Sequence, residues 1–194
     1  MAAPSAVTMH NLSGIWVVSK YLSDDAEPCY KLQGMPWALR KFLSLVTITN
    51  RVTQTSDEKG CTRIKISSTI SGGFEFDIDP YILDGRESST AQGSQRVRAH
   101  WIDFRCPKLA SFGGGLIDPY LTQDWLEDAS ATTWDHVYIY ILNARGGWTA
   151  EYVWGFALKD GQRHFVKKVL MRKGEYSIRM AIVHDWNGPL PHPD

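Results

Sequence analysis

The sequence predicts an all-β protein, an antiparallel up-and-down β-barrel in which one or two short helices close an end. Three observations favour this fold. Strand-like runs of apolar and β-branched residues recur along the chain, short glycine turns join the last four of them, and helical patterns are few and short. Closing such a sheet removes its exposed edges, and a barrel of nine or ten strands can hold one small ligand.

The first predicted strand, residues 12–20, opens with a Gly-x-Trp sequence. A glycine lets the chain bend tightly where the barrel closes, and an indole two residues later points to the same side of the strand. We therefore expect Gly14 and Trp16 to form the floor of the barrel. One core tryptophan on an ordinary strand is the plainer interpretation of the same motif.

A polar connection at residues 23–28 leads to a short amphipathic helix. Within residues 32–43, Pro36 suits the first helical position, and Trp37, Leu39, Phe42 and Leu43 give the helix an apolar side. This helix either contacts a ligand as a lid on the barrel or only caps the core.

The other strands are predicted at residues 45–54, 62–69, 73–78, 95–104, 134–143, 148–158, 163–172 and 175–185. Residues 84–94 are predicted to be a polar loop. Residues 106–133 are predicted to be a long covering loop with a short helix at 121–126, either an entrance flap or a plain surface excursion. We assign the whole chain, residues 1–194, to a single domain with extended termini at residues 1–10 and 187–194.

Composition narrows the choice of partners. The 21 Lys and Arg balance the 21 Asp and Glu, so no overall charge attracts nucleic acid or an acidic membrane surface. Eight Trp, eight Tyr and seven Phe suit a cavity for an apolar or flat molecule. With no secretion signal and no segment long enough to span a membrane, we expect a cytoplasmic protein. Three scattered cysteines and six unclustered histidines favour reduced thiols and no metal site.

The last two hairpins define the faces of the sheet. With two-residue turns at 160–161 and 173–174, Trp154 faces Lys167, and Lys167 faces Met180. Both hairpins then agree on one apolar face, which we assign to the interior: Tyr152, Trp154, Phe156, Phe165, Val169, Met171, Tyr176, Ile178, Met180 and Ile182, ending near His184. The opposite face is expected to meet solvent and carries His164, Lys168, Ser177 and Arg179.

The strand before these hairpins takes either orientation, depending on the length of the loop that follows it. An even loop turns Val137, Ile139 and Ile141 inward and Tyr138 and Tyr140 outward, whereas an odd loop reverses them. Outward tyrosines would expose aromatic surface, which suggests a homodimer.

Catalytic signatures of hydrolases, kinases and dehydrogenases are absent from the sequence. The clearest anomaly is Lys167, because the register places its ammonium group on the apolar face opposite Trp154. A buried ammonium must be paired, stacked on an aromatic ring or neutralised. Lys167 either grips a ligand oxygen as a donor or acid, or lies near the rim and reaches water.

Tyr176 and His184 complete the predicted catalytic set with Lys167. A tyrosine hydroxyl in an apolar setting needs a partner, which a ligand can supply. His184 is also explained as a satisfied rim histidine, and Trp101 as a core residue. The predicted substrate-binding residues are Trp154, Tyr152, Phe156, Phe165, Met180, Trp101 and Trp37.

Several stretches of the chain resemble a group of small fungal lipocalin-like proteins: residues 13–17 and 22–25, 33–41, 146–156 and 183–186. Within this group the sequence is similar to the hetero-Diels-Alderases of tropolone sesquiterpenoid biosynthesis. The resemblance implies a lipocalin-like (calycin) barrel and an enzyme of fungal secondary metabolism that needs no cofactor. It does not assign catalytic residues.

The activity implied by the resemblance joins a tropolone to a terpene. A hydroxymethyl tropolone loses water to give a quinone methide, which adds to a humulene-type sesquiterpene inside the barrel. A non-enzymatic carrier of an apolar metabolite needs the same apolar barrel and is an alternative. A dehydratase or isomerase of another natural-product pathway is a second one.

Overall fold

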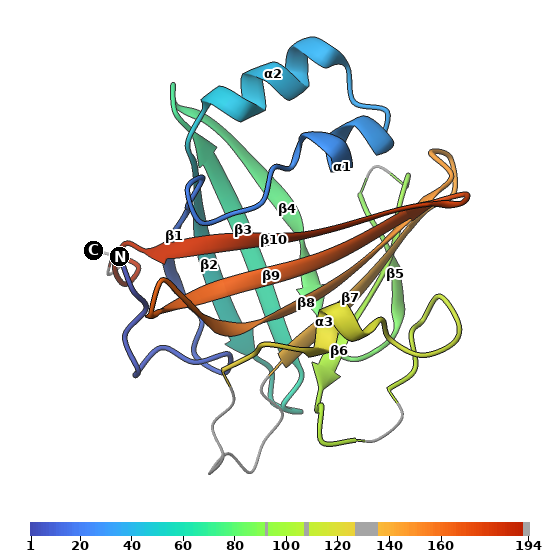
Figure 1. Ribbon diagram of the computed structural model, residues 1–194. Helices are drawn as coiled ribbons and strands as arrows, with labels where there is room; N and C mark the ends of the chain where they lie inside the picture. Colours follow the sequence, from blue (N-terminus) through green and yellow to red (C-terminus); the bar gives the residue numbers. More distant parts are fainter. Residues whose placement is uncertain (92, 107–108, 127–135, 192–194) are drawn as a thin grey trace.

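A single curled sheet dominates the computed structural model, which describes residues 1–91, 93–106, 109–126 and 136–191. Its ten antiparallel strands follow the order β4-β3-β2-β1-β10-β9-β8-β7-β6-β5. The first strand pairs with both the second and the last, so the sheet curls into a half-barrel. Helices α1 and α2 lie together across one side of it (Figure 1). The predicted antiparallel, all-β fold with short helices is confirmed.

The strands are β1 (Gly14–Val18), β2 (Ile48–Ser56), β3 (Thr62–Ile70), β4 (Phe74–Ile82), β5 (Glu87–Ser89), β6 (Arg96–Ile102), β7 (His136–Asn143), β8 (Trp148–Lys159), β9 (Gln162–Lys173) and β10 (Tyr176–Trp186). The helices are α1 (Glu27–Leu32), α2 (Trp37–Leu45) and α3 (Pro119–Thr122). No helix in the described ranges is both long and apolar enough to cross a membrane. The three cysteines are free thiols.

Two elements differ from the sequence prediction. The supposed polar connection ends in α1, where Pro28 occupies the first turn and so costs no helical hydrogen bond. The supposed loop at residues 84–94 contains β5, whose three residues are all exposed and give no apolar alternation to detect. In the covering segment (residues 109–126), the short helix predicted at residues 121–126 is α3, Pro119–Thr122, and the Asp118 carboxylate accepts a hydrogen bond from Tyr120 N at its N-terminus.

The predicted strand register is correct for one of the two hairpins that defined the faces and wrong for the other. Trp154 lies opposite Lys167, as predicted for β8 and β9. Between β9 and β10 the register is shifted, so Lys167 lies opposite Ile182, two residues beyond the predicted partner. The turn is formed by Gly174, with a φ of 56°, and Glu175. Because a shift of two residues preserves the direction of every side chain, the predicted faces hold.

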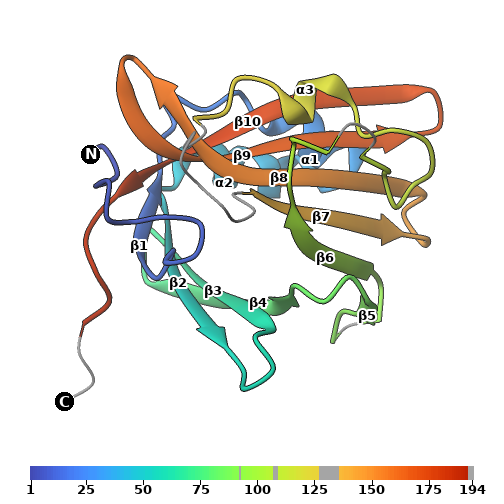
Figure 2. The same cartoon turned by 90° about the horizontal axis from the view of Figure 1, so that it is seen from below.

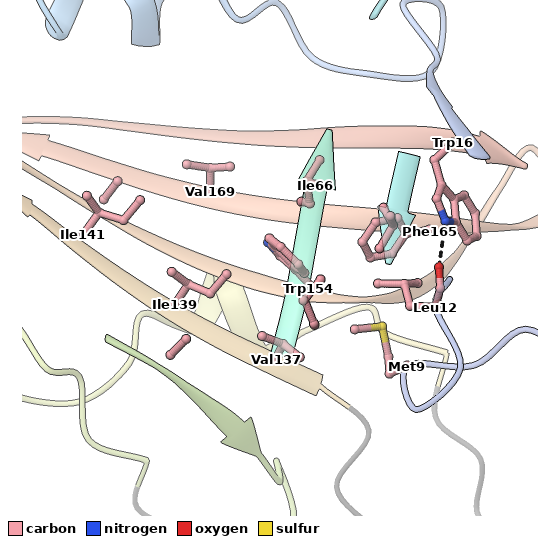
Figure 3. Packing of buried hydrophobic residues seen from close by; sticks show 14 of the residues in the cluster. Met9, Leu12, Trp16, Ile66, Val137, Ile139, Ile141, Trp154, Phe165 and Val169 are labelled. Atoms are coloured by element: carbon pink, nitrogen blue, oxygen red, sulfur yellow. Dashed lines mark hydrogen bonds between the residues drawn. The ribbon is translucent and has the colours of Figure 1, made fainter. Parts of the chain in front are cut away.

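The orientation of β7 agrees with an even loop. Val137, Ile139 and Ile141 are buried in the interior cluster, which also contains Trp154 and Val169 (Figure 3). Tyr138 points outward yet is fully buried, because it packs in a second cluster beneath the covering segment. The homodimer prediction was based on aromatic surface exposed by outward tyrosines, and the burial of Tyr138 removes that basis.

The covering segment, residues 109–126, lies on the outside of the barrel wall. Figure 2 shows α3 and the chain beside it against the outer surface of β8, β9 and β10. The described part of the predicted covering loop is therefore a surface excursion over the wall and not a flap at the cavity; residues 107–108 and 127–133 of that prediction lie outside the described residues. Ser177 and Arg179 are exposed as predicted, but the same expectation is wrong for His164 and Lys168, which are buried on this outer face.

The predicted floor is confirmed at one end of the interior. Trp16 is fully buried, and its Nε1 donates a hydrogen bond of 3.0 Å to Leu12 O (Figure 3). Its ring lies 5.1 Å from that of Phe165 and 4.7 Å from that of Trp186, centroid to centroid. A Cβ on Gly14 would come within 2.2 Å of the Trp186 ring, so close packing requires glycine there.

The first ten residues pack against this floor instead of forming a free extended end. Ala3, Val7 and Met9 are buried. The Arg163 guanidinium donates hydrogen bonds to Pro4 O and Val7 O, at 2.8 and 2.7 Å. The N-terminal segment thus helps to close the barrel.

Candidate functional site

The interior holds a cavity of about 530 Å³, within the size range of sites for one small-molecule ligand or a compact pair. Strands β1 to β4 and β8 to β10 supply its walls, and α1 and α2 supply one side. Arg40, Leu43 and Ser44 of α2 line the cavity, so this helix borders the ligand space.

Lys167 projects from β9 into this cavity. Its side chain is only 9% exposed, and its Nζ lies 4.2 Å from the centre of the Trp154 ring and 5.5 Å from that of Phe165. No hydrogen bond or ion pair joins Nζ to another residue in the described part of the chain. Burial lowers the pKa of the amine from 10.5 to about 7, because the charged form loses its hydration. Lys167 is therefore an interior amine and not a residue of the solvent-exposed rim.

His184 is on β10 and lies close to Lys167 of the neighbouring strand β9. Both residues contact the same aromatic ring, since the His184 and Phe165 centroids are 5.0 Å apart. Burial, and then the nearby Lys167, lower the pKa of His184 well below 6.5, so the imidazole is neutral at pH 7. Its buried Nδ1 has no hydrogen-bond partner in the described structure.

Aromatic side chains from β4 and β8 complete this wall. The Trp154 Nε1 is buried without a hydrogen-bond partner among the described residues. The Tyr81 ring stands edge-on to Trp154 at 5.2 Å, and burial raises the pKa of its phenol to about 12. Burial also raises the pKa of Tyr152, so both phenols are neutral hydrogen-bond donors at pH 7.

The sequence analysis missed two polar pairs that line the cavity. Ser68 Oγ donates a 2.8 Å hydrogen bond to Asn50 Oδ1, and both residues are buried on β3 and β2. At the helices, Arg40 Nε and Glu27 Oε1 form an ion pair of 2.8 Å. The alternation of Ile64, Ile66 and Ser68 on β3 could have placed Ser68 on the inner face, whereas the ion pair depends on how two helices meet and has no sequence signal.

The predicted site residues fall into three groups. Those that line the cavity are Lys167, His184, Tyr152, Trp154 and Met180. Phe165 and Phe156 are buried in the adjoining core instead, where the Arg163 guanidinium lies 3.5 Å from the centre of the Phe156 ring. The residues outside the cavity lining are Tyr176, Trp37 and Trp101.

The reasons for these last three placements are local. Tyr176 begins β10 at the tip of the hairpin and is 78% exposed, so its assignment to the interior is wrong. Trp37 is 65% exposed at the start of α2. Trp101 stacks on His10, with ring centroids 4.3 Å apart, and is thereby packed against the N-terminal segment.

In chemical terms, the cavity is an apolar container with a few polar groups on one wall. The Lys167 amine, Trp154 Nε1 and His184 Nδ1 can form hydrogen bonds there, because none of the three has a hydrogen-bond partner among the described residues. Within the described residues, no three His, Cys, Asp or Glu side chains are grouped so as to hold a metal ion.

Comparison with known proteins gives two similar fungal sequences and no matching family model. The probable pericyclase scpY of Mollisia scopiformis is 27% identical over 192 residues, which cover 97% of this chain and 96% of that protein. The pericyclase pydY of an Acremonium species is 28% identical over 195 residues, covering 97% and 98%. These full-length similarities confirm the resemblance to a fungal pericyclase family.

Solved structures with the same fold include small lipid-binding proteins. A Schistosoma mansoni fatty acid binding protein in complex with arachidonic acid has a TM-score of 0.52 at 11% identity, covering 93% of this chain and 99% of that one. The apo form of lipid binding protein 8 from Caenorhabditis elegans gives 0.52 at 11%, covering 93% and 100%. At this identity the likeness shows the fold alone, and it confirms the lipocalin-like (calycin) architecture.

Proposed function

We propose that this chain is a pericyclase that acts inside the cavity without a cofactor. The observation that carries the proposal is the cavity wall, where Lys167 Nζ, His184 Nδ1 and Trp154 Nε1 have no hydrogen-bond partner among the described residues. The full-length similarity to two fungal pericyclases supports it. In a pericyclic reaction the main role of the protein is to hold the two reactants in attack geometry, which can lower the activation barrier by roughly 7 to 11 kcal/mol.

The reaction we propose is a hetero-Diels–Alder addition in fungal secondary metabolism. A hydroxymethyl tropolone first loses water to form a quinone methide. The oxygen and the exocyclic carbon of this quinone methide then add across an alkene of a humulene-type sesquiterpene, forming one C–O bond and one C–C bond. The flat ring would lie against Trp154 and Tyr81, and the terpene against the aliphatic wall that includes Met180 and Ile182.

Lys167 has the most direct chemical role in this proposal. Because its pKa is about 7, both protonation states are populated at neutral pH, and the ammonium can protonate the departing hydroxyl. The indole N–H of Trp154 can then donate a hydrogen bond to the tropolone oxygen as charge develops there. Neutral His184 is a hydrogen-bond partner beside them and not a second cation.

The test is to incubate the purified protein with a hydroxymethyl tropolone and humulenol, and to resolve the product stereoisomers by chiral chromatography. One isomer should exceed its share in the mixture formed in buffer alone. Lys167→Met should retain the fold and lower product formation by about 100-fold, the smaller end of a general-acid contribution. Lys59→Met, on an exposed turn, is the matched control and should behave as the unaltered protein.

Three other outcomes would contradict the proposal. Unchanged turnover by Lys167→Met would remove Lys167 from the site. Binding of both substrates with the buffer product ratio would indicate a carrier of apolar metabolites. Conversion of one substrate without addition to the second would indicate a dehydratase or isomerase.

A further inference from the structure

Two adjacent lysines on β9 are buried on opposite sides of the barrel wall. Lys168 points outward, where its Nζ donates a hydrogen bond to Gln123 O and lies 3.9 Å from the Asp124 carboxylate. The Trp125 ring centre is 4.9 Å from the same nitrogen. Lys168 is thus fully engaged in holding the covering segment. Lys167 points inward, where its Nζ contacts aromatic rings but has no hydrogen bond or ion pair among the described residues.

The Lys167 amine borders ligand space on an aromatic surface. Its Nζ rests over the Trp154 ring at 4.2 Å, and no carboxylate among the described residues pairs with it. The cavity is large enough for an apolar molecule of one or two rings to reach the amine. A primary amine in this position is a nucleophile held next to a ligand.

We propose that Lys167 is a reversible covalent attachment site for flat, apolar aldehydes and unhindered ketones, which it binds as Schiff bases inside the cavity. The proposal goes beyond the pericyclic reaction and does not depend on it. It rests on the position of the amine, the absence of a protein partner for Nζ in the described structure, and the apolar space in front of it.

The chemistry needs only the carbonyl compound. The lone pair of the neutral amine forms a C–N bond to the carbonyl carbon, and proton transfer from nitrogen to oxygen gives a carbinolamine. Loss of the hydroxyl group together with the remaining proton of the nitrogen, as water, then leaves a neutral imine with a C=N bond, and addition of water reverses the step. His184, whose Nδ1 is free among the described residues, lies beside the amine and can relay the proton between nitrogen and oxygen.

The lowered pKa supports this reactivity. At pH 7 an amine with a pKa of about 7 is roughly half neutral, whereas an ordinary lysine with a pKa near 10.4 is neutral in about one molecule in 2,500. The neutral fraction of Lys167 therefore exceeds that of a surface lysine by about 1,000-fold. Selectivity for Lys167 should follow at neutral pH even though the chain has many exposed lysines.

The experiment uses 2-naphthaldehyde as the probe. The whole protein is incubated with the aldehyde at pH 7, reduced with borohydride to convert the imine to a secondary amine, and digested for peptide mass spectrometry. We expect one main adduct, on Lys167, that adds the mass of the aldehyde less one oxygen atom. Labelling of Lys167 should exceed that of any exposed lysine by at least 10-fold.

Lys168 is an internal control in the same peptide region, because it is also buried but faces away from the cavity. Lys167→Met should abolish the main adduct while its near-ultraviolet circular dichroism stays unchanged. Labelling spread over exposed lysines, labelling of Lys168, or binding of the aldehyde without a trapped adduct would each overturn the proposal. Since no pericyclase substrate is present, these outcomes are separate from success or failure in the product assay.

Discussion

Replacing Lys167 by methionine should stabilise the protein, and the gain should depend on pH. In the folded chain the amine has a pKa of about 7 in place of 10.5. Between these two values the unfolded chain binds a proton that the folded chain does not. Stability of the unaltered protein is therefore lost as pH falls from about 10.5 to about 7, and stays level below that. Methionine has a similar length and no charge, so it removes this dependence.

The magnitude follows from the size of the pKa change. A difference of about 3.5 in pKa corresponds to about 5 kcal/mol at 1.36 kcal/mol for each pH unit. The contact of Nζ with the Trp154 ring favours the ammonium by up to about 2 kcal/mol and offsets part of this cost. Lys167→Met should thus be more stable than the unaltered protein by about 3 to 5 kcal/mol at pH 7.

The assay is urea unfolding followed by tryptophan fluorescence at pH 7.0, 8.5 and 10.0. The difference in unfolding free energy between Lys167→Met and the unaltered protein should shrink steadily as pH rises. Lys59→Met, which removes an exposed amine, should leave the pH profile unchanged. Parallel profiles for the unaltered protein and Lys167→Met would show that the amine keeps an ordinary pKa, and would refute the burial argument.

Four further changes test other parts of the structure. Gly155→Ala should cost about 1 to 3 kcal/mol in urea unfolding, because its Cβ would lie 2.5 Å from the buried His136 ring. The pKa of His136 is lowered to about 4, so stability should fall by up to about 3 kcal/mol as pH drops from 6.5 to 4, and His136→Gln should flatten this part of the curve. Tyr138→Phe removes the 2.7 Å hydrogen bond to Glu151 and should cost about 1 to 3 kcal/mol without altering ligand affinity, measured by titration. Tyr176→Phe should leave the product ratio unchanged, because its side chain lies outside the cavity lining; a changed ratio would restore it to the site.

The sequence predicted the cavity wall because strand alternation and turn residues act over short distances. The turn at Asp160 and Gly161, both with positive φ, sets the register of β8 and β9 directly. The next turn was misplaced, yet the error of two residues equals the side-chain period of a strand. Lys167 was therefore found on the correct face even though its partner on β10 was not.

The outer wall shows where this reasoning fails. On the outer face of β9 the polar residues His164 and Lys168 are interspersed with Val166 and Leu170, a mixed pattern that does not separate an exposed face from a covered one. The two polar residues are buried because the covering segment and the N-terminal residues, which are distant in sequence, pack over them. Alternation along one strand records which side is more polar, but it does not record what later covers that side. The burial of Tyr138 could not be predicted from its strand for the same reason, because the covering segment packs over it.

Unpartnered buried nitrogens occur on both faces of the wall, but only those of the inner face border the cavity, and this position gives them a functional interpretation. On the outer wall Lys168 donates a hydrogen bond to Gln123 O, and Tyr138 donates one to Glu151. The Nδ1 atoms of His100 and His164 have no hydrogen-bond partner among the described residues, although His164 Nδ1 lies 3.4 Å from the Asp185 carboxylate.

On the inner wall, Lys167, Trp154 and His184 gather around the Phe165 ring, and Lys167 Nζ, Trp154 Nε1 and His184 Nδ1 have no hydrogen-bond partner among the described residues. A buried amine without a partner lowers stability, and a methionine at that position would fold more stably. A polar group that costs stability in an interior able to hold a ligand is best explained by what it does to that ligand. For this reason the stability assay and the product assay on Lys167→Met should move in opposite directions, a higher unfolding free energy accompanying a lower yield. A variant that gained stability and kept full product formation would leave the unpaired amine without a functional explanation.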